Sequence, residues 1–209
     1  VLDAWHTLHN CRVVSAMLES SDDVKYAYMK ALGAWTSGSL GFTDGTVGGL
    51  KVDGTSFHHG GHYPGYSVGA FAALGEFIRF TFGTDFEIDE AARRDFKEAL
   101  MAMYDYTNGR DWGIGVCGRH PLSGRIPDAD VEAYGQLALL GDLTGKGLAA
   151  DPDLAGAYIA LGGKERKALA AFKKAGIKAK QAPDGFRVYN YGAFGVHRRN
   201  GWMLTLKGF

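Results

Sequence analysis

Cysteine is scarce in this sequence. The 209 residues include two, Cys11 and Cys117. Two thiols are too few for a disulfide framework, so the chain is not a small scaffold held together by disulfides. Whether these two cysteines pair is left open by the sequence, and the redox compartment is left open with it.

Net charge and long apolar runs are also missing. The 23 basic side chains balance 23 acidic ones, which gives a formal net charge of zero. Such a chain has no global attraction for nucleic acid or for a membrane surface, so any site for a polyanion has to be a local cluster. No apolar run approaches the length of a membrane span. The composition is typical of a soluble globular protein.

The sequence does not start like a complete protein. No signal-peptide pattern follows Val1, and the chain opens without an initiator methionine in what reads as the middle of a helix. We therefore expect the natural N-terminus, and any targeting segment on it, to lie outside this sequence. The length allows one domain with a core, or one domain and part of another.

Apolar residues recur at helical spacing through most of the chain. This spacing predicts two helices over 2–18 and 22–35, and a deeply packed helix over 66–82 with Tyr66 in its first turn. Asp89 is expected to cap a helix that includes Tyr104. Later helices are predicted over 128–140, 151–161 and 164–175, the last with a basic face that we expect to be solvated surface. Long loops are predicted over 37–57 and 107–127.

The periodicity changes after residue 183. Residues 186–189 predict a strand, and residues 193–198 and 202–206 predict a hairpin with its turn at 199–201. Helices therefore come first and strands last, which favours an α+β fold with segregated layers. A hairpin alone is marginal, so we expect its apolar face, with Phe194, Val196, Trp202 and Leu204 as candidates, to have lost a covering sheet.

The most informative stretch runs from Asp53 to Ser67. Three histidines and two tyrosines lie there among glycines, which allow sharp turns and leave room for a ligand. An imidazole and a phenol on one loop can divide proton transfer at a single substrate carbon, which makes His59 and Tyr66 the candidate catalytic pair. The alternative is a glycine-rich turn whose aromatic rings only pack. A cluster of this kind favours the functional interpretation.

The same stretch resembles the active-site segment of polysaccharide lyase family eight, and most closely that of the chondroitin sulfate ABC lyases. Two further stretches resemble the family in the same order. Residues 118–121 are similar to its catalytic arginine loop, and residues 192–198 with 205–207 to the start of its β-domain. The resemblance implies an incomplete (α/α) toroid of helical hairpins over residues 1–180. It also implies the first strands of an antiparallel β-sandwich domain over residues 181–209.

The resemblance also implies a reaction. Lyases of this family cleave uronic-acid polysaccharides such as chondroitin and dermatan sulfate, with hyaluronan as a further candidate, by β-elimination that leaves a 4,5-unsaturated uronate. By correspondence, Tyr66 would act as base and then as acid, His59 would assist, and Arg119 would stabilise the phenolate. We expect these three groups to converge on one cleft. The family's glutamate would lie beyond Phe209, and its carboxylate-neutralising groups before Val1, so the chain alone is expected to be inactive and poorly soluble.

Six other residues are candidates for substrate binding, and four of them, Tyr63, Trp112, His120 and Arg125, have an equally plausible packing or surface role. Tyr63 and Trp112 could stack on sugar faces, and Arg125 and His120 could hold sulfate or carboxylate groups. His58 and His62 complete the set, although they stand where close relatives have arginine and asparagine. The preferred polysaccharide and the endo or exo mode of cleavage stay open.

Two rival interpretations remain. His58, His59 and His62 could bind zinc in a metal-dependent hydrolase, but adjacent histidines on a loop usually point apart and no carboxylate follows at a helical ligand spacing. A non-catalytic glycan-binding module would keep the aromatic and arginine residues without explaining the pairing of His59 with Tyr66. Under the lyase interpretation no cofactor is required, although a divalent cation such as calcium could assist. The protein would be a secreted or periplasmic monomer that binds an acidic polysaccharide, and neither nucleic acid nor a membrane.

Overall fold

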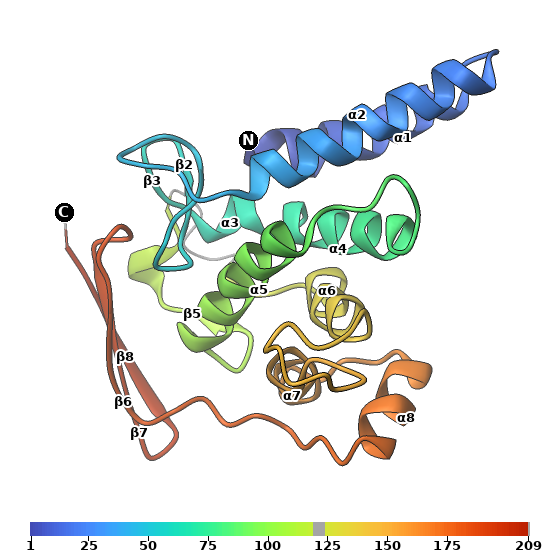
Figure 1. Ribbon diagram of the computed structural model, residues 1–209. Helices are drawn as coiled ribbons and strands as arrows, with labels where there is room; N and C mark the ends of the chain where they lie inside the picture. The colour runs from blue at the N-terminus through green and yellow to red at the C-terminus, as the bar shows by residue number, and fades with distance from the viewer. Residues whose placement is uncertain (119–123, 209) are drawn as a thin grey trace.

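The structure is a computed structural model that describes residues 1–118 and 124–208. It has the predicted α+β order, with helices first and a sheet at the C-terminal end (Figure 1). The helices are η1 (Ala4–Leu8), α1 (His9–Met17), α2 (Asp22–Leu40), α3 (Pro64–Ser67), α4 (Ala70–Thr81), α5 (Glu90–Asp105), η2 (Ile114–Val116), α6 (Asp128–Ala138), α7 (Pro152–Ala160) and α8 (Arg166–Lys174).

Within the described residues, the strands form three antiparallel sheets. The first contains β1 (Gly49–Leu50), β2 (Ser56–His58) and β3 (Gly61–His62), and the second pairs β4 (Thr107–Asn108) with β5 (Asp111–Trp112). The third contains β6 (Gly185–Tyr189), β7 (Phe194–Arg199) and β8 (Trp202–Lys207). The first two sheets lie within the stretches that the sequence analysis assigned to loops, because strands of two or three residues are too short to leave an alternating pattern.

Three helix predictions differ from the structure in detail. The first helix begins as the π-helical turn η1, and the second extends to Leu40 rather than ending at residue 35. The predicted helix over 66–82 is divided into α3 and α4, because Val68 is extended and Gly69 has a φ of 79°. Tyr66 consequently lies on the single turn α3 and not on the first turn of a long helix.

The core lies between the helices, with α4 at its centre. This helix packs against α6 and η1, and α5 packs against α2 and α7. Phe71 of α4 and Phe96 of α5 meet edge to face with their ring centroids 5.3 Å apart. The predicted cap is confirmed, since the carboxylate of Asp89 accepts a hydrogen bond from the Ala92 amide at 2.7 Å.

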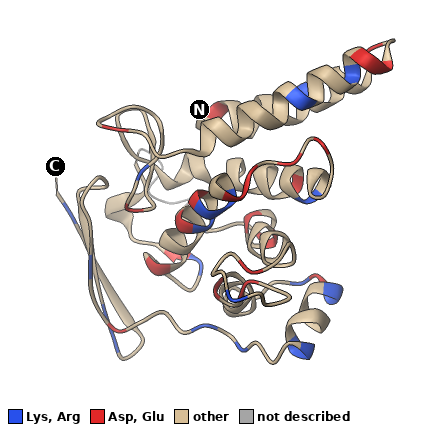
Figure 2. Cartoon of the chain, viewed as in Figure 1, with Lys and Arg blue, Asp and Glu red and all other residues tan. Residues whose placement is uncertain are grey.

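Charged side chains are distributed in both signs over the helices (Figure 2). The basic residues on and beside α8 are exposed, which agrees with the prediction of a solvated face.

Cys11 is exposed, Cys117 is buried, and both are free thiols, so they do not pair. Among the described residues, no helix combines the length and apolar character needed to cross a membrane.

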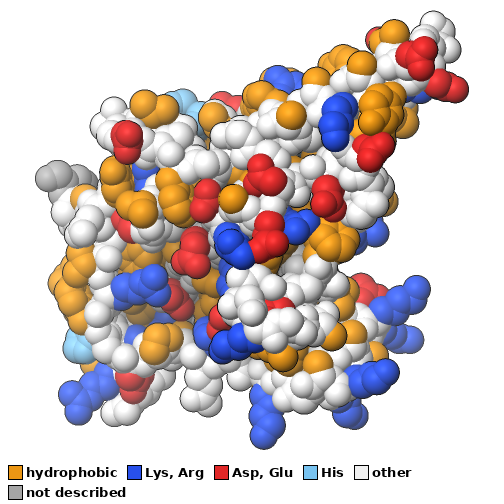
Figure 3. All heavy atoms as spheres, in the orientation of Figure 1, with side chains coloured by type: hydrophobic (Ala, Val, Ile, Leu, Met, Phe, Trp, Pro, Cys, Tyr) orange, Lys and Arg blue, Asp and Glu red, His pale blue; other side chains and the backbone are white. Residues whose placement is uncertain are grey.

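The C-terminal sheet presents two different faces. Phe194 and Val196 of β7 are buried against the helical part of the chain, so the prediction that they belong to an uncovered face is wrong. They alternate with residues on the opposite face, which is apolar and exposed at Phe186, Val188, Trp202, Leu204 and Leu206. Apolar atoms gather at the left edge of the molecule over this sheet (Figure 3).

Candidate active site

The histidine segment is built on a tight hairpin. Strand β2 pairs with β3 through Phe57 opposite His62 and His58 opposite Gly61. His59 and Gly60 form the two-residue turn, with φ values of 53° and 81°. Two successive positive φ values match the hairpin turn that fits the twist of antiparallel strands. A histidine in this left-handed region is uncommon, and such strain tends to occur at functional sites.

The turn aims His59 at Tyr66. The two side chains approach within 3.3 Å between Nε2 and Oη, so the predicted proximity of this pair is confirmed. His59 is exposed and Tyr66 half-buried, which leaves the pair open to a ligand. Tyr66 is also held through its neighbour Ser67, whose hydroxyl shares a hydrogen bond with the hydroxyl of Ser56 on β2. One strand therefore fixes both the imidazole and the phenol.

His58 completes a cluster of rings. Its ring centroid lies 4.0 Å from that of His59 and 4.1 Å from that of Tyr66. The expectation that adjacent histidines point apart is wrong here, because the left-handed residue at 59 turns its side chain back over the strand. On the far side, His58 Nε2 lies 3.3 Å from a carboxylate oxygen of Asp3. Sequence reasoning missed Asp3, since nothing in a polar residue before η1 points to a partner 55 positions later.

His62 is packed inside the protein. It is 7% exposed, its ring is stacked on Phe194 with centroids 5.2 Å apart, and its Nδ1 accepts a hydrogen bond from the Ser56 amide at 3.2 Å. Burial lowers the pKa of His62 to about 3, so the imidazole is neutral. His62 thus joins the hairpin to the C-terminal sheet, and its predicted contact with substrate stays a prediction.

The remaining candidates separate into three groups. Trp112 is 5% exposed, and Tyr63 is 8% exposed with its ring 4.7 Å from that of Tyr66; their stacking on sugar faces stays a prediction. Arg125 is exposed, and its Nε lies 3.8 Å from a carboxylate oxygen of Asp111. Arg119 and His120 lie outside the described residues.

A metal centre finds little support in this geometry. The described part of the chain contains no group of three or more His, Cys, Asp or Glu side chains arranged to hold a metal ion. The proposed triad fails because His62 is turned into the core, away from His58 and His59. What remains at the surface is an imidazole and a phenol within proton-transfer distance.

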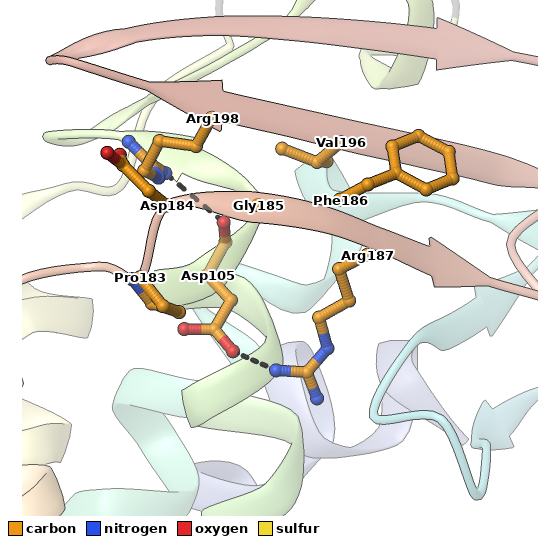
Figure 4. A pocket seen from close by; sticks show the side chains of 8 residues that line it. All are labelled: Asp105, Pro183, Asp184, Gly185, Phe186, Arg187, Val196 and Arg198. Atoms are coloured by element: carbon orange, nitrogen blue, oxygen red, sulfur yellow. Dashed lines mark hydrogen bonds and ion pairs between the residues drawn. The ribbon is translucent and has the colours of Figure 1, made fainter.

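A separate cavity lies at the junction of α5 with the C-terminal sheet. It has a volume of about 210 Å³ and is lined by residues of α5, β6, β7 and the segment before β6. Figure 4 shows Arg187 directed at the Asp105 carboxylate and Arg198 at the Asp105 carbonyl oxygen. Burial raises the pKa of Asp105, and the Arg187 guanidinium opposes that effect. Arg187 pairs with the Asp105 carboxylate, and Arg198 donates to the backbone carbonyl oxygens of Asp105 and Thr107, so these groups join α5 and β4 to the C-terminal sheet.

Comparison with known proteins points to lyases. A family model described as "Lyase, catalytic" matches residues 1–168. The chain is 30% identical over 209 residues to a chondroitin sulfate ABC endolyase of Proteus vulgaris, a match that covers 100% of this chain and 20% of the relative. It is 28% identical over 227 residues to a chondroitin sulfate ABC exolyase of Bacteroides thetaiotaomicron, covering 99% of the chain and 22% of the relative. The chain thus spans about a fifth of the length of these relatives.

Proposed function

The chain belongs to the lyase catalytic-domain family, and from this membership we propose that it carries the proton-transferring pair of a polysaccharide lyase. The observation that supports the proposal most directly is the 3.3 Å approach of His59 Nε2 to Tyr66 Oη at an exposed turn. A β-elimination needs a base for the proton beside the uronate carboxylate and an acid for the leaving oxygen. One phenol with an adjacent imidazole can supply both.

The proposed mechanism assigns one task to each group. Tyr66 removes the C5 proton of the uronic acid and then protonates the C4 glycosidic oxygen as it leaves. His59 accepts or returns a proton at the phenol, and acts as base where the uronic acid has the opposite configuration at C5. Arg119 stabilises the phenolate. The strained turn at His59 supports this mechanism, because it holds the imidazole toward Tyr66 before substrate arrives.

The substrate class follows from the relatives. Two of them are named for chondroitin sulfate, and we propose an acidic, uronic-acid-containing polysaccharide of that class for this chain. His58, whose Nε2 lies 3.3 Å from a carboxylate oxygen of Asp3, stands beside the pair of His59 and Tyr66 and would contact the polysaccharide there.

The wider architecture is proposed on the same basis. The helical hairpins of residues 1–180 would form part of an (α/α) toroid, and residues 181–209 would open an antiparallel β-sandwich. The reaction would need no cofactor, because phenol and imidazole exchange the protons, and a divalent cation such as calcium would only assist. The protein would act as a secreted or periplasmic monomer.

The decisive experiment is incubation with chondroitin sulfate, followed by ultraviolet absorbance and mass spectrometry of the products. It is run on this chain and on the longest natural polypeptide that contains it. A lyase yields unsaturated ends, whereas a hydrolase yields saturated ends heavier by one water. Tyr66→Phe should lower kcat about 10²- to 10⁴-fold and leave substrate binding nearly intact.

Three outcomes would contradict the proposal. Saturated products abolished by a chelator would favour a metal-dependent hydrolase, and binding without any product from either polypeptide would favour a glycan-binding module. Full activity of the Tyr66→Phe variant would show that the chemistry lies elsewhere. Retained activity after treatment with a chelator would agree with a cation that only assists.

A further inference from the structure

A buried carboxylate on α6 caps a different helix. Asp130 is 1% exposed, and its Oδ1 accepts hydrogen bonds from the amides of Gly69 at 2.8 Å and Ala72 at 3.3 Å. These amides belong to the first turn of α4, where Gly69 itself has no side chain with which to cap the helix. The cap that normally comes from the adjoining residue is here supplied from the neighbouring helix.

The capped position is the joint between α3 and α4. Gly69 has a φ of 79°, and a Cβ added to it would lie 2.6 Å from Nε2 of His6 on η1. The joint is thus enclosed by the His6 ring and by the carboxylate of Asp130. Tyr66 lies three residues before Gly69, on a helix of a single turn. A helix this short has little stability of its own, so its orientation depends on what holds its ends.

The two ends of this turn are held differently. At the hairpin, Ser56 and Ser67 join β2 to α3 through their hydroxyls. At the other end, the hydrogen bonds to Asp130 join the joint to α6, which packs closely along α4. Burial raises the pKa of Asp130 to about 7, so the carboxylate occupies a place that is unfavourable for its charge. The hydrogen bonds that Asp130 accepts at the joint offset the unfavourable burial of its charge.

We infer that Asp130 is a positioning residue for Tyr66, which holds the joint between α3 and α4 and so sets the approach of the phenol to His59. The inference rests on the proposed function for the role of Tyr66, although the geometry of the joint does not. Displacement of a reacting group by about 1 Å can cost about a hundredfold in rate. Loss of the cap should therefore appear in kcat rather than in substrate affinity.

The test compares three variants with the unchanged protein, each made in the longest natural polypeptide that contains this chain. Asp130→Ala removes both acceptors, and Asp130→Asn keeps an oxygen at nearly the same place. Asp89→Ala is the matched control, because it removes the cap of α5, which carries none of the proposed catalytic groups. Hydrogen exchange at the Gly69 and Ala72 amides reports on the joint, and steady-state kinetics on chondroitin sulfate report on Tyr66.

The expected pattern is specific. In Asp130→Ala, the Gly69 and Ala72 amides should exchange at least about tenfold faster, while the later turns of α4 keep their protection. Its kcat should fall about tenfold to a hundredfold with KM changed less than about threefold. Asp130→Asn should restore both readouts to within about threefold. Asp89→Ala should lower the melting temperature without lowering kcat.

Each contrary result has a separate meaning. Faster exchange in Asp130→Ala with unchanged kcat, in a protein that Tyr66→Phe inactivates, would overturn the inference and leave the proposed function standing. Full activity of Tyr66→Phe would overturn the proposed function, while the exchange data would still show whether Asp130 holds the joint. An equal fall of kcat in Asp89→Ala would reduce the effect to general stability and overturn the inference. If Asp130→Ala does not fold, the test rests on Asp130→Asn. A tenfold loss of kcat in Asp130→Asn, with the Gly69 and Ala72 amides still protected, would overturn the inference.

Discussion

Acid should weaken this protein through one buried ring. The pKa of His62 is about 3 in the folded chain and ordinarily 6.5, so protons bind more readily to the unfolded chain. Stability from the neutral imidazole is complete above pH 6.5 and is lost as the pH falls toward 3. At pH 5, which is roughly 1.5 units below the ordinary pKa, the imidazole is almost fully protonated in the unfolded chain and neutral in the folded chain. The expected loss is about 2 kcal/mol relative to pH 7.5.

Other buried groups contribute to the same pH range. Burial lowers the pKa of His9 to about 4, which adds a loss in the same direction. Burial raises the pKa of Asp130 to about 7, so its contribution falls as the pH rises and opposes the histidines. The pH dependence of the unchanged protein is therefore a sum of opposing effects. The contribution of His62 is the difference in that dependence between the protein and His62→Gln.

The assay is urea unfolding followed by tryptophan fluorescence at pH 7.5 and pH 5. His62→Gln should be less stable at pH 7.5, because it loses the stacking on Phe194. When the pH is lowered from 7.5 to 5, its free energy of unfolding should fall by about 2 kcal/mol less than that of the unchanged protein. Phe194→Leu is the control: it removes the stacked ring without removing the titrating group, so the pH effect should persist. An identical pH effect in His62→Gln and the unchanged protein would refute the reasoning.

The other predictions concern single positions. His59→Gly should be more stable than His59→Ala by about 1 kcal/mol in urea unfolding, because the turn needs a φ of 53°; the reverse order would mean that the turn is not strained. Gly69→Ala should cost more than about 2 kcal/mol through its φ and the His6 ring, whereas Gly38→Ala, inside α2 with open space around it, should be neutral or stabilising; equal effects would contradict this account of the joint. Leu204→Lys, on the exposed face of the sheet, should raise the solubility limit without lowering the melting temperature, and a large loss of stability would show that this face is packed.

Local chemistry could be predicted from the sequence where the partners are neighbours in the chain. Asp89 caps the helix that follows it, and the turn at Asn200 and Gly201 joins the strands assigned to its two sides. The proximity of His59 and Tyr66 is of the same kind, because they lie seven positions apart on a glycine-rich segment. In each case the signal and its partner lie within one short segment, where turn and cap preferences act directly.

Contacts between distant segments could not be predicted in this way. The apolar pattern of residues 66–82 continues through Gly69, so only the His6 ring and the carboxylate of Asp130, both remote in sequence, explain the break. His62 is a candidate for substrate binding because it lies in the segment that resembles the lyases. Its burial depends on Phe194, which arrives from the last sheet. The burial of Trp112 likewise depends on tertiary packing, which the local sequence pattern does not predict.

The stacking of His62 on Phe194 has a consequence for the order of folding. It joins the hairpin that carries His59 to a strand more than 130 positions later, so the contact closes a very long loop. Contacts of such sequence separation form slowly, because the entropy of closing the loop is lost before the contact stabilises anything. During synthesis the hairpin emerges long before its stacking partner. We therefore expect the helices to assemble first and the imidazole and phenol to reach their final alignment only after β7 has docked.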